Sequence, residues 1–499
     1  MYDYKNITNL RGVERETLRI KKNGALAKTS HHASLGHKLT NDSITVDFSE
    51  DLLELITSPH TDVDSTFNEL SNLTAFTLQN ISQDEIILNT SMPLSATEDE
   101  ISEANFGSSN SGMMKQAYRK GLSVRYGKIM QIISGIHYNF SIDESLMLQK
   151  AKELAISKSA VYFGVINNYF ECMWLLPYLF GASPICAKTS VKDKPDYLSE
   201  LDEEFYVGKY ATSLRMSDLG YTSPAQKDLH ISYAGVSPYV KDLIAATAET
   251  FTDYSKIGLY DDFNQRIQLN QSILQIENEY YSPIRPKQIA NRGERPACAL
   301  INRGVEYIEV RVLDVDPFDV NGISKNTALF VEAMLMSCFD NDFNKYSKES
   351  VYRAKQNLNK VAIDGRNPNL KLQNLAGEEV VLKDYALTLF AKIEEIAEKM
   401  GEEFVEAVSI EKEKILDISK TPSARLVRLA KAHGYKNAVL DISKDVTSKF
   451  RETSLADEVA KKLVDQAANS FGAEEVLRKS DNISLDKYIK GYYESGGCC

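Results

Sequence analysis

Four segments in the first two thirds of the chain alternate apolar and polar residues, the pattern of a β-strand with one buried face. They span residues 11–20, 43–48, 132–140 and 304–314. Helical periodicity lies between them, over residues 50–56, 64–80, 112–130 and 145–170. Because several strands are close enough in sequence for antiparallel pairing, we predict an α+β fold built around a mostly antiparallel sheet.

From residue 325 onward the pattern changes to amphipathic helices rich in Glu, Lys, Ala and Leu, with little proline or glycine. The predicted helices span residues 325–340, 347–362, 383–400, 402–417, 422–434 and 454–470. We therefore expect a sheet-based catalytic core over residues 1–325 and a helical C-terminal part over residues 326–499 that packs on it.

The first two strands carry acidic residues on one face, because residues i and i+2 of a strand point the same way. Glu14 and Glu16 share a face of the first strand. In the second strand Asp47 is expected opposite the apolar residues, which are Ile44, Val46 and Phe48.

The third and fourth strands have the same two-faced pattern. In the third, the polar side is His137, Asn139 and Ser141, and the apolar side is Ile136, Tyr138 and Phe140. In the fourth, Ile308, Val310 and Val312 form the apolar side, and the other side holds Tyr307, Glu309, Arg311 and Leu313.

These polar faces favour a metal site over a solvated surface. A polar face can simply face water, but such faces usually mix Lys, Thr, Ser and Gln, whereas these carry Glu, Asp, His and Arg. Glu54 would join them from the helix predicted over residues 50–56. Carboxylates packed together raise one another's pKa, and divalent cations remove the conflict. One histidine among acids favours magnesium or manganese, because zinc sites usually contain more His or Cys.

The chain lacks a P-loop, a Gly-x-Gly-x-x-Gly fingerprint and a Gly-x-Ser-x-Gly elbow. An acidic metal face without these motifs suggests an ATP-using enzyme of another design. Arginine forks suit carboxylates and phosphates. The strand register ties Arg311 to the acidic face, and the further basic and aromatic candidates are Arg215, Tyr221, Tyr281, Arg285 and Lys287.

Composition narrows the class of protein. The 499 residues are 43% hydrophobic and 26% charged, which suits a soluble protein with a substantial core. A net charge of −12 makes nucleic acid a poor partner. We find no signal-peptide pattern and no apolar run near the ~20 residues of a membrane helix, so we expect a cytoplasmic enzyme without a membrane partner. The cysteine spacing favours reduced thiols, and we assign no role to Cys498 or Cys499.

Seven sequence blocks, in order from residue 11 to residue 317, resemble glutamate–cysteine ligase of the γ-proteobacterial type. They are RGVERETLRI, TVDFSEDLLELIT, RYGKIMQIISGIHYNFS, PYLFGASPIC, YATSLRMSDLGYT, QIENEYYSPIRPK and GVEYIEVRVLDVDP. The resemblance implies that ATP phosphorylates the γ-carboxylate of glutamate and that the cysteine amine attacks the acyl phosphate. The products would be γ-glutamylcysteine, ADP and phosphate, in the first step of glutathione synthesis. It also implies a curved sheet forming a funnel, of the glutamine synthetase and guanidino kinase type.

Residue by residue, the resemblance implies the following roles. The ligands of Mg²⁺ or Mn²⁺ would be Glu14, Glu16, Asp47, Glu54, His137 and Glu309. Arg311 would contact the transferring phosphoryl group, and Arg215 would lie at the substrate site. The substrate pocket would hold Tyr118, Gln131, Tyr221, Tyr281, Phe48 and Arg285. The expected partners are glutamate, cysteine and ATP as co-substrate, and a monomeric state is left open.

Three alternatives remain. The same ligase could use another amine acceptor such as 2-aminobutyrate, because a pocket discriminates one small group by only about 1–3 kcal/mol. A guanidino kinase-like phosphotransferase would phosphorylate a guanidino acceptor and form no amide bond. A catalytically inactive scaffold would be expected to have a broken acid cluster, whereas all six ligand positions hold chelating side chains.

Overall fold

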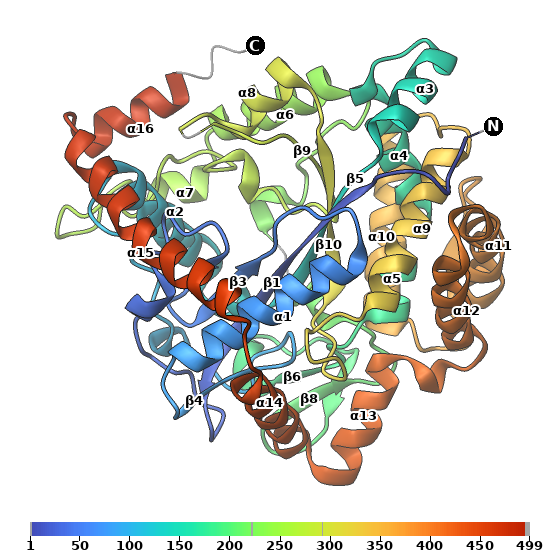
Figure 1. Cartoon of the computed structure of the whole chain (residues 1–499), viewed down its shortest axis with the longest axis horizontal. Helices are drawn as coiled ribbons and strands as arrows, with labels where there is room; N and C mark the ends of the chain where they lie inside the picture. The colour runs from blue at the N-terminus through green and yellow to red at the C-terminus, as the bar shows by residue number, and fades with distance from the viewer. Residues whose placement is uncertain (1, 221–222, 292, 495–499) are drawn as a thin grey trace.

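The main sheet of the computed structural model has seven strands, paired antiparallel in the order β2–β3–β1–β5–β10–β9, with β4 also paired to β1. Residues 2–220, 223–291 and 293–494 are described. The strands are β1 (Leu10–Lys21), β2 (Ile44–Val46), β3 (Leu52–Ile56), β4 (Glu85–Ile87), β5 (Gly135–Ser141), β9 (Ile284–Lys287) and β10 (Tyr307–Asp314). The sheet is open and crosses the middle of the molecule (Figure 1), which confirms the α+β class.

One sequence prediction within the sheet is wrong, because residues 52–56 of the helix predicted over residues 50–56 form strand β3. Leu53 and Leu55 pack in one apolar cluster, whereas Leu52 packs in another on the opposite face of the sheet. A strand buried on both faces has consecutive apolar residues and loses the alternation that identifies strands. Pairing with β1 on one side and β2 on the other decides its conformation.

Helices pack around the sheet, and the first two thirds of the chain supply eight of them within the described residues. They are α1 (Val63–Asn80), α2 (Asn110–Tyr126), α3 (Glu144–Leu154), α4 (Lys158–Cys172), α5 (Leu175–Phe180), α6 (Val236–Ala248), α7 (Thr252–Ile257) and α8 (Pro296–Arg303). The predicted helix over residues 145–170 is divided into α3 and α4. Ala155 ends α3 in a left-handed conformation with φ 53°, and the Ser157 hydroxyl then caps the N-terminus of α4.

A small sheet beside this core has the strand order β6 (Ile185–Ala187), β8 (Phe205–Gly208), β7 (Leu198–Glu200).

The two faces of the main sheet have different surroundings. On one face, Tyr138 of β5 and Val310 of β10 belong to the larger apolar cluster, which also contains side chains of α1, α4 and α9 (Lys325–Asp340). On the other face, Leu18 of β1 belongs to a separate, smaller cluster. Glu14 and Glu16 share the face of Leu18, because they are four and two residues from it. The acids therefore lie on the face opposite the main core.

The last third of the chain is helical apart from a hairpin of β11 (Lys371–Gln373) and β12 (Glu379–Val381). After α9 the helices are α10 (Lys348–Asp364), α11 (Leu382–Met400), α12 (Glu402–Leu416), α13 (Pro422–His433), α14 (Tyr435–Glu452), α15 (Asp457–Ser480) and α16 (Leu485–Glu494). The sequence pattern misses α14 and α16. Only Gly434, at φ 78°, separates α13 from α14, so one glycine turns the chain without a loop.

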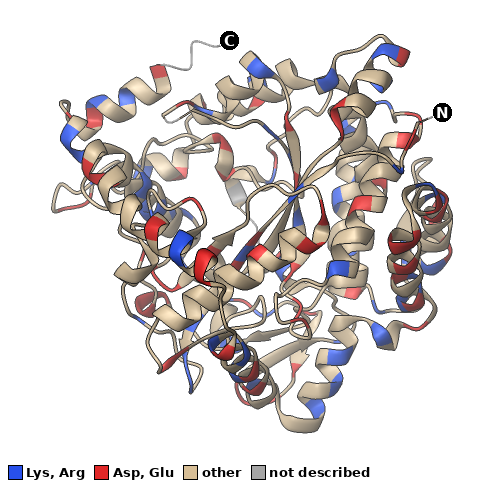
Figure 2. Ribbon diagram, viewed as in Figure 1, with Lys and Arg blue, Asp and Glu red and all other residues tan. Residues whose placement is uncertain are grey.

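The C-terminal helices return to the N-terminal half of the chain (Figure 1). Helix α14 packs against α1 and β4, α15 against the short 3₁₀ helix η1 (Ala33–Leu35), and α16 against α2. Acidic and basic residues are interspersed on outer helices such as α11 and α12 (Figure 2). The division of the chain at residue 325 stays a prediction.

Two further sequence expectations can be compared with the described residues. None of their helices is both long and apolar enough to cross a membrane. Cys172, Cys186 and Cys338 are free and buried, as expected for reduced thiols, but Cys298 is disulfide-bonded. The pair Cys498 and Cys499 lies outside the described residues.

Candidate active site

A cavity of about 300 Å³ lies on the polar face of the main sheet. Its lining includes most of the site residues expected from the sequence, namely Glu14, Glu16, Asp47, Phe48, Glu54, Tyr118, Gln131, His137, Tyr281, Arg285, Lys287, Glu309 and Arg311. Arg215 is fully buried behind this lining, and its Nη2 donates to the backbone carbonyl of Arg311. Tyr221 lies outside the described residues.

The strand register brings the acids together. Glu14 on β1 pairs with His137 on β5, and Glu16 on β1 pairs with Glu54 on β3. Paired residues of antiparallel strands point to the same face, about 5 Å apart. Strand β10 lies on the other side of β5, and its Glu309 pairs with Asn139, so Glu309 points to the same face of the sheet. Glu54 therefore reaches the site from a strand, not from the predicted helix.

Phe48 does not share the face of Ile44 and Val46, so that prediction is wrong. Strand β2 ends at Val46, and the chain turns immediately, with the Asp47 N–H donating to the carbonyl of Leu52. This turn moves Phe48 into the smaller apolar cluster, whereas Ile44 and Val46 belong to the larger one. The turn also brings both Asp47 and Phe48 to the cavity.

Leu313 is a second error of face assignment. The pairing of β10 with β5 shifts by one residue between Val310 and Leu313, so Arg311 and Val312 together oppose His137. Such a bulge breaks the two-residue period. Leu313 consequently packs in the main core beside Val312, while Arg311 lines the cavity.

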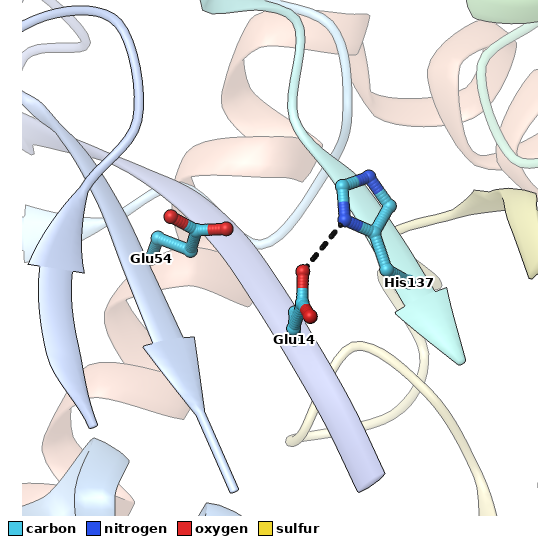
Figure 3. A group of neighbouring side chains, drawn as sticks. All are labelled: Glu14, Glu54 and His137. Carbon is cyan, nitrogen blue, oxygen red and sulfur yellow. Dashed lines mark hydrogen bonds and ion pairs between the residues drawn. The ribbon is translucent and has the colours of Figure 1, made fainter. Parts of the chain in front are cut away.

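Three of the expected metal ligands lie close enough to share one cation. Glu14, Glu54 and His137 each present a ligand atom, and these atoms all lie within 4.8 Å of one another. Figure 3 shows the three side chains projecting from neighbouring strands, with the contact between His137 Nδ1 and Glu14 Oε2, 3.0 Å long, dashed. The second oxygen of Glu14 accepts a hydrogen bond from Asn139 Nδ2 at 2.8 Å, which fixes the carboxylate.

Two buried ligand atoms at the site have no hydrogen-bond partner among the described residues. They are Nε2 of His137 and Oε2 of Glu309. Buried polar atoms are normally satisfied, and an ion is one explanation for an orphaned group. Glu16 is held from behind, because its Oε2 accepts from the Gly135 N–H at 2.6 Å. The donor set of carboxylates and one imidazole fits Mg²⁺ or Mn²⁺.

The carboxylates differ in their protonation. Burial, followed by the charges of neighbouring carboxylates, raises the pKa of Glu54 well above its ordinary value. Burial likewise raises the pKa of Glu16. Burial also opposes ionisation of Glu14, but the hydrogen bond with His137 and the charges of His137 and Lys287 together outweigh it and lower the pKa. Without a cation, this group of acids therefore cannot all be charged together.

The part of the cavity lining around Glu309 is basic. Glu309 Oε1 lies 3.1 Å from Arg311 Nη1 and 3.6 Å from Lys287 Nζ, and its Oε2 lies 3.8 Å from Arg285 Nη1. Although burial opposes its ionisation, these cations hold the pKa of Glu309 well below the ordinary value. Glu309 thus lies at the boundary between an acidic half, which suits divalent cations, and a basic half, which suits phosphate oxygens.

A third side of the cavity is aromatic and amide-lined. Gln131 Nε2 donates to the Tyr281 hydroxyl at 3.4 Å, and Tyr118 faces the same space from α2. Four polar lining residues are not anticipated by the sequence reading: Lys115, Arg119, Asn278 and Glu279. Arg119 was detectable in principle, because it lies on α2 directly after Tyr118. Its Nε donates to the backbone carbonyl of Asp47, which fixes the turn beyond β2.

Comparison with known proteins identifies the family. The family model described as "Glutamate-cysteine ligase" matches residues 4–361. The chain belongs to the glutamate–cysteine ligase family. Relatives named glutamate–cysteine ligase include one from Saccharophagus degradans, 38% identical with 100% of this chain and 98% of the relative covered, and one from Pseudomonas aeruginosa PAO1, 39% identical with 97% and 94% covered.

A solved member of the family has the same fold throughout. The glutamate–cysteine ligase of Francisella tularensis, crystallised in complex with AMP, superposes with a TM-score of 0.99 over 100% of both chains, at 66% sequence identity. A bifunctional glutathione synthetase from Pasteurella multocida has a TM-score of 0.71 at 24% identity, over 96% of this chain and 57% of that protein. This second likeness shows that the fold also occurs within a longer protein.

Proposed function

We propose that the cavity on the polar face of the sheet is the active site at which this ligase joins the γ-carboxylate of glutamate to the amine of cysteine with ATP. The observation that carries the proposal is the charge arrangement around Glu309, where an acidic cluster and three cations meet in one cavity of about 300 Å³. The AMP complex of the Francisella relative supports a nucleotide site.

The acidic half would hold the divalent ions. Glu14, Glu16, Asp47, Glu54, His137 and Glu309 are the proposed ligands of Mg²⁺ or Mn²⁺. When bound, such ions would neutralise the negative charge of phosphate oxygens. The finer fold assignment, a funnel of the glutamine synthetase and guanidino kinase type, belongs to the same proposal, because that shape would enclose the reacting groups.

The basic half would stabilise the transferring phosphoryl group. Arg311 reaches the cavity from the bulge of β10 and lies beside Lys287 and Arg285, so fixed positive charge is present before substrates bind. Cations fixed in this way lower the energy of phosphoryl transfer, in which negative charge spreads over the phosphoryl oxygens. The resulting γ-glutamyl phosphate has a good leaving group for attack by an amine.

The aromatic side would receive the amine acceptor. Tyr118, Gln131, Tyr281 and Phe48 form a wall suited to a small side chain such as that of cysteine. Because one small group is discriminated by only about 1–3 kcal/mol, 2-aminobutyrate is expected to react more slowly but detectably.

Mass spectrometry of reactions with ATP, Mg²⁺, glutamate and a panel of amino acids tests this proposal. We expect γ-glutamylcysteine and ADP in equal amounts, with cysteine giving the fastest ADP release. Equal rates with all amino acids would overturn the acceptor assignment. A phosphorylated guanidino compound without an amide product would replace the ligase reaction with phosphotransfer.

A further inference from the structure

The sheet has an unusual backbone arrangement at Arg311. Val310 of β10 pairs with Ile284 of β9, so the next pair along these antiparallel strands joins Arg311 to Pro283. A hydrogen-bonded pair of this kind normally exchanges two N–H···O bonds. The Arg311 N–H does donate to the Pro283 carbonyl, at 3.0 Å. Proline has no N–H, so Pro283 cannot donate the second hydrogen bond of this pair to the Arg311 carbonyl.

Arg215 supplies the missing donor. Its Nη2 lies 3.1 Å from the Arg311 carbonyl oxygen, and the arginine is only 1% exposed. The guanidinium is seated against the first residue of β5, where a Cβ added to Gly135 would lie 1.9 Å from Nη2. The glycine is therefore needed for the arginine to reach the backbone of β10.

Asp314, three residues further along β10, holds Arg215 in this place. Its Oδ1 lies 3.8 Å from Arg215 Nη1. The carboxylate is itself fixed by hydrogen bonds from the hydroxyls of Ser183, at 2.6 Å, and Ser213, at 2.9 Å, and from the N–H of Ala182, at 2.8 Å. A carboxylate with this many donors remains in one orientation and balances the buried arginine.

We propose that Arg215, held by Asp314, is a positioning residue that donates the backbone hydrogen bond Pro283 cannot give. This bond fixes the bulge of β10, and the bulge directs the Arg311 side chain to Glu309 and His137. Arg311 Nη1 lies 3.1 Å from Glu309 Oε1 and 3.4 Å from His137 Nδ1. The inference rests on the proposed function for the role of Arg311, and it gives Arg215 a different task from direct substrate contact.

A rescue experiment tests the hydrogen bond. Arg215→Met should lower kcat about 100-fold while the KM for cysteine stays within about threefold, because a misplaced catalytic group costs rate in this range. Adding Pro283→Ala restores an N–H opposite Arg311, and the double variant should regain kcat roughly tenfold, the equivalent of one hydrogen bond. Pro283→Ala alone should give no gain.

A double-mutant cycle tests whether Arg215 acts through Arg311. In an Arg311→Ala background, Arg215→Met should cause little further loss of kcat. Asp314→Asn, which removes the charge facing Arg215 and replaces one of the two acceptor oxygens by an amide donor, should show a smaller loss with the same lack of additivity. The matched control is Arg451→Met. Arg451 also donates to backbone carbonyls, such as that of Ser82, but neither residue lines the cavity. It should lower the melting temperature without changing kcat.

The outcomes separate this inference from the proposed function. γ-Glutamylcysteine formation by the unmodified chain tests the function alone. The positioning role would be overturned if the losses of kcat in Arg215→Met and Arg311→Ala multiply in the double variant. It would also be overturned if Pro283→Ala fails to raise kcat in the Arg215→Met variant. The melting temperatures of Arg215→Met, Pro283→Ala and the double variant can also be compared, so the hydrogen bond is tested without turnover. Additive changes in melting temperature would count against it.

Discussion

At the scale of single residues, Glu309 is the most informative position. It is 1% exposed and lies between the acidic cluster and the cations Arg311, Lys287 and Arg285. In the proposed active site its carboxylate would supply a ligand oxygen, and it faces three positive charges, so an uncharged replacement changes both halves of the cavity at once.

Glu309→Gln should lower kcat about 100- to 1,000-fold, the cost of removing one preorganised electrostatic group. The steady-state rate at saturating Mg²⁺ measures the effect, and circular dichroism checks the fold. Glu411→Gln is a matched control, because Glu411 is also buried but lies on α12, paired with Lys414. A near-normal rate for Glu309→Gln would contradict the metal-cluster assignment.

His31 gives a pH dependence that is separate from catalysis. Burial first, and then the charges of Lys38 and Arg19, lower its pKa from 6.5 to about 3. The unfolded chain therefore binds a proton below pH 6.5 that the folded chain accepts only near pH 3. Its contribution to stability is present above pH 6.5 and is lost as the pH falls toward 3, by up to about 1.4 kcal/mol per pH unit.

Urea denaturation at pH 7 and pH 5 measures this contribution. The free energy of unfolding of His31→Phe should fall less between the two pH values than that of the unmodified chain. His433→Gln, at an exposed position near the end of α13, should retain the original pH slope. Parallel pH profiles for His31→Phe and the unmodified chain would show that His31 is not buried in its neutral form.

At the scale of elements, a buried ion pair joins the sheet to one of its covering helices. Arg11 at the start of β1 lies 2.8 Å from Glu332 on α9, and the two side chains are 7% and 1% exposed. Asn9 also donates to this carboxylate at 2.9 Å. The pair joins the strand that carries Glu14 and Glu16 to the helix behind it, on the face opposite the cavity.

Arg11→Met should lower the free energy of unfolding by about 3–5 kcal/mol, because it leaves the Glu332 carboxylate buried without its cation. Arg11→Met combined with Glu332→Leu should recover most of the loss, since neither charge then remains. Chemical denaturation measures both values. Equal destabilisation of the single and double variants would show that packing, not charge, governs this contact.

At the scale of the whole molecule, the C-terminal helices complete the N-terminal half. Helix α14 packs on α1 and β4, and it buries Tyr435, Val439, Leu440, Val446 and Phe450. Helix α15 is largely exposed, with Leu463, Ala467 and Ser470 as its buried residues. The two helices therefore contribute unequally to stability, although both lie near the end of the chain.

Truncation should show this inequality. A chain ending after Gly434 loses several large buried side chains at about 1.5–3 kcal/mol each, which approaches or exceeds the 5–15 kcal/mol stability of a typical protein. A chain ending after Leu455 should remain folded with a lower melting temperature. Soluble expression and thermal unfolding distinguish the two. Similar behaviour of both truncations would contradict the assigned role of α14.

The amino-acid sequence by itself determined which residues form the two-faced strands, and hence that Glu14, Glu16, His137 and Glu309 lie on polar faces. Period-two alternation is a local property, so it can be read without knowing the strand partners. The resemblance then assigned the family and the roles. Tertiary structure decided the rest. Glu54 became a strand residue because β1 and β2 pair on both its sides, and Leu313 changed face because of the bulge in β10.

The same reason explains Arg215. Nothing in its local sequence shows that Pro283, far along the chain, has no N–H to offer the Arg311 carbonyl of β10, or that Gly135 leaves room for a guanidinium. Backbone hydrogen bonds between distant strands arise only when the sheet forms, and the groups that complete them need share no sequence pattern. Strand faces are therefore legible in the sequence, whereas the contacts that direct Arg311 exist only in the folded molecule.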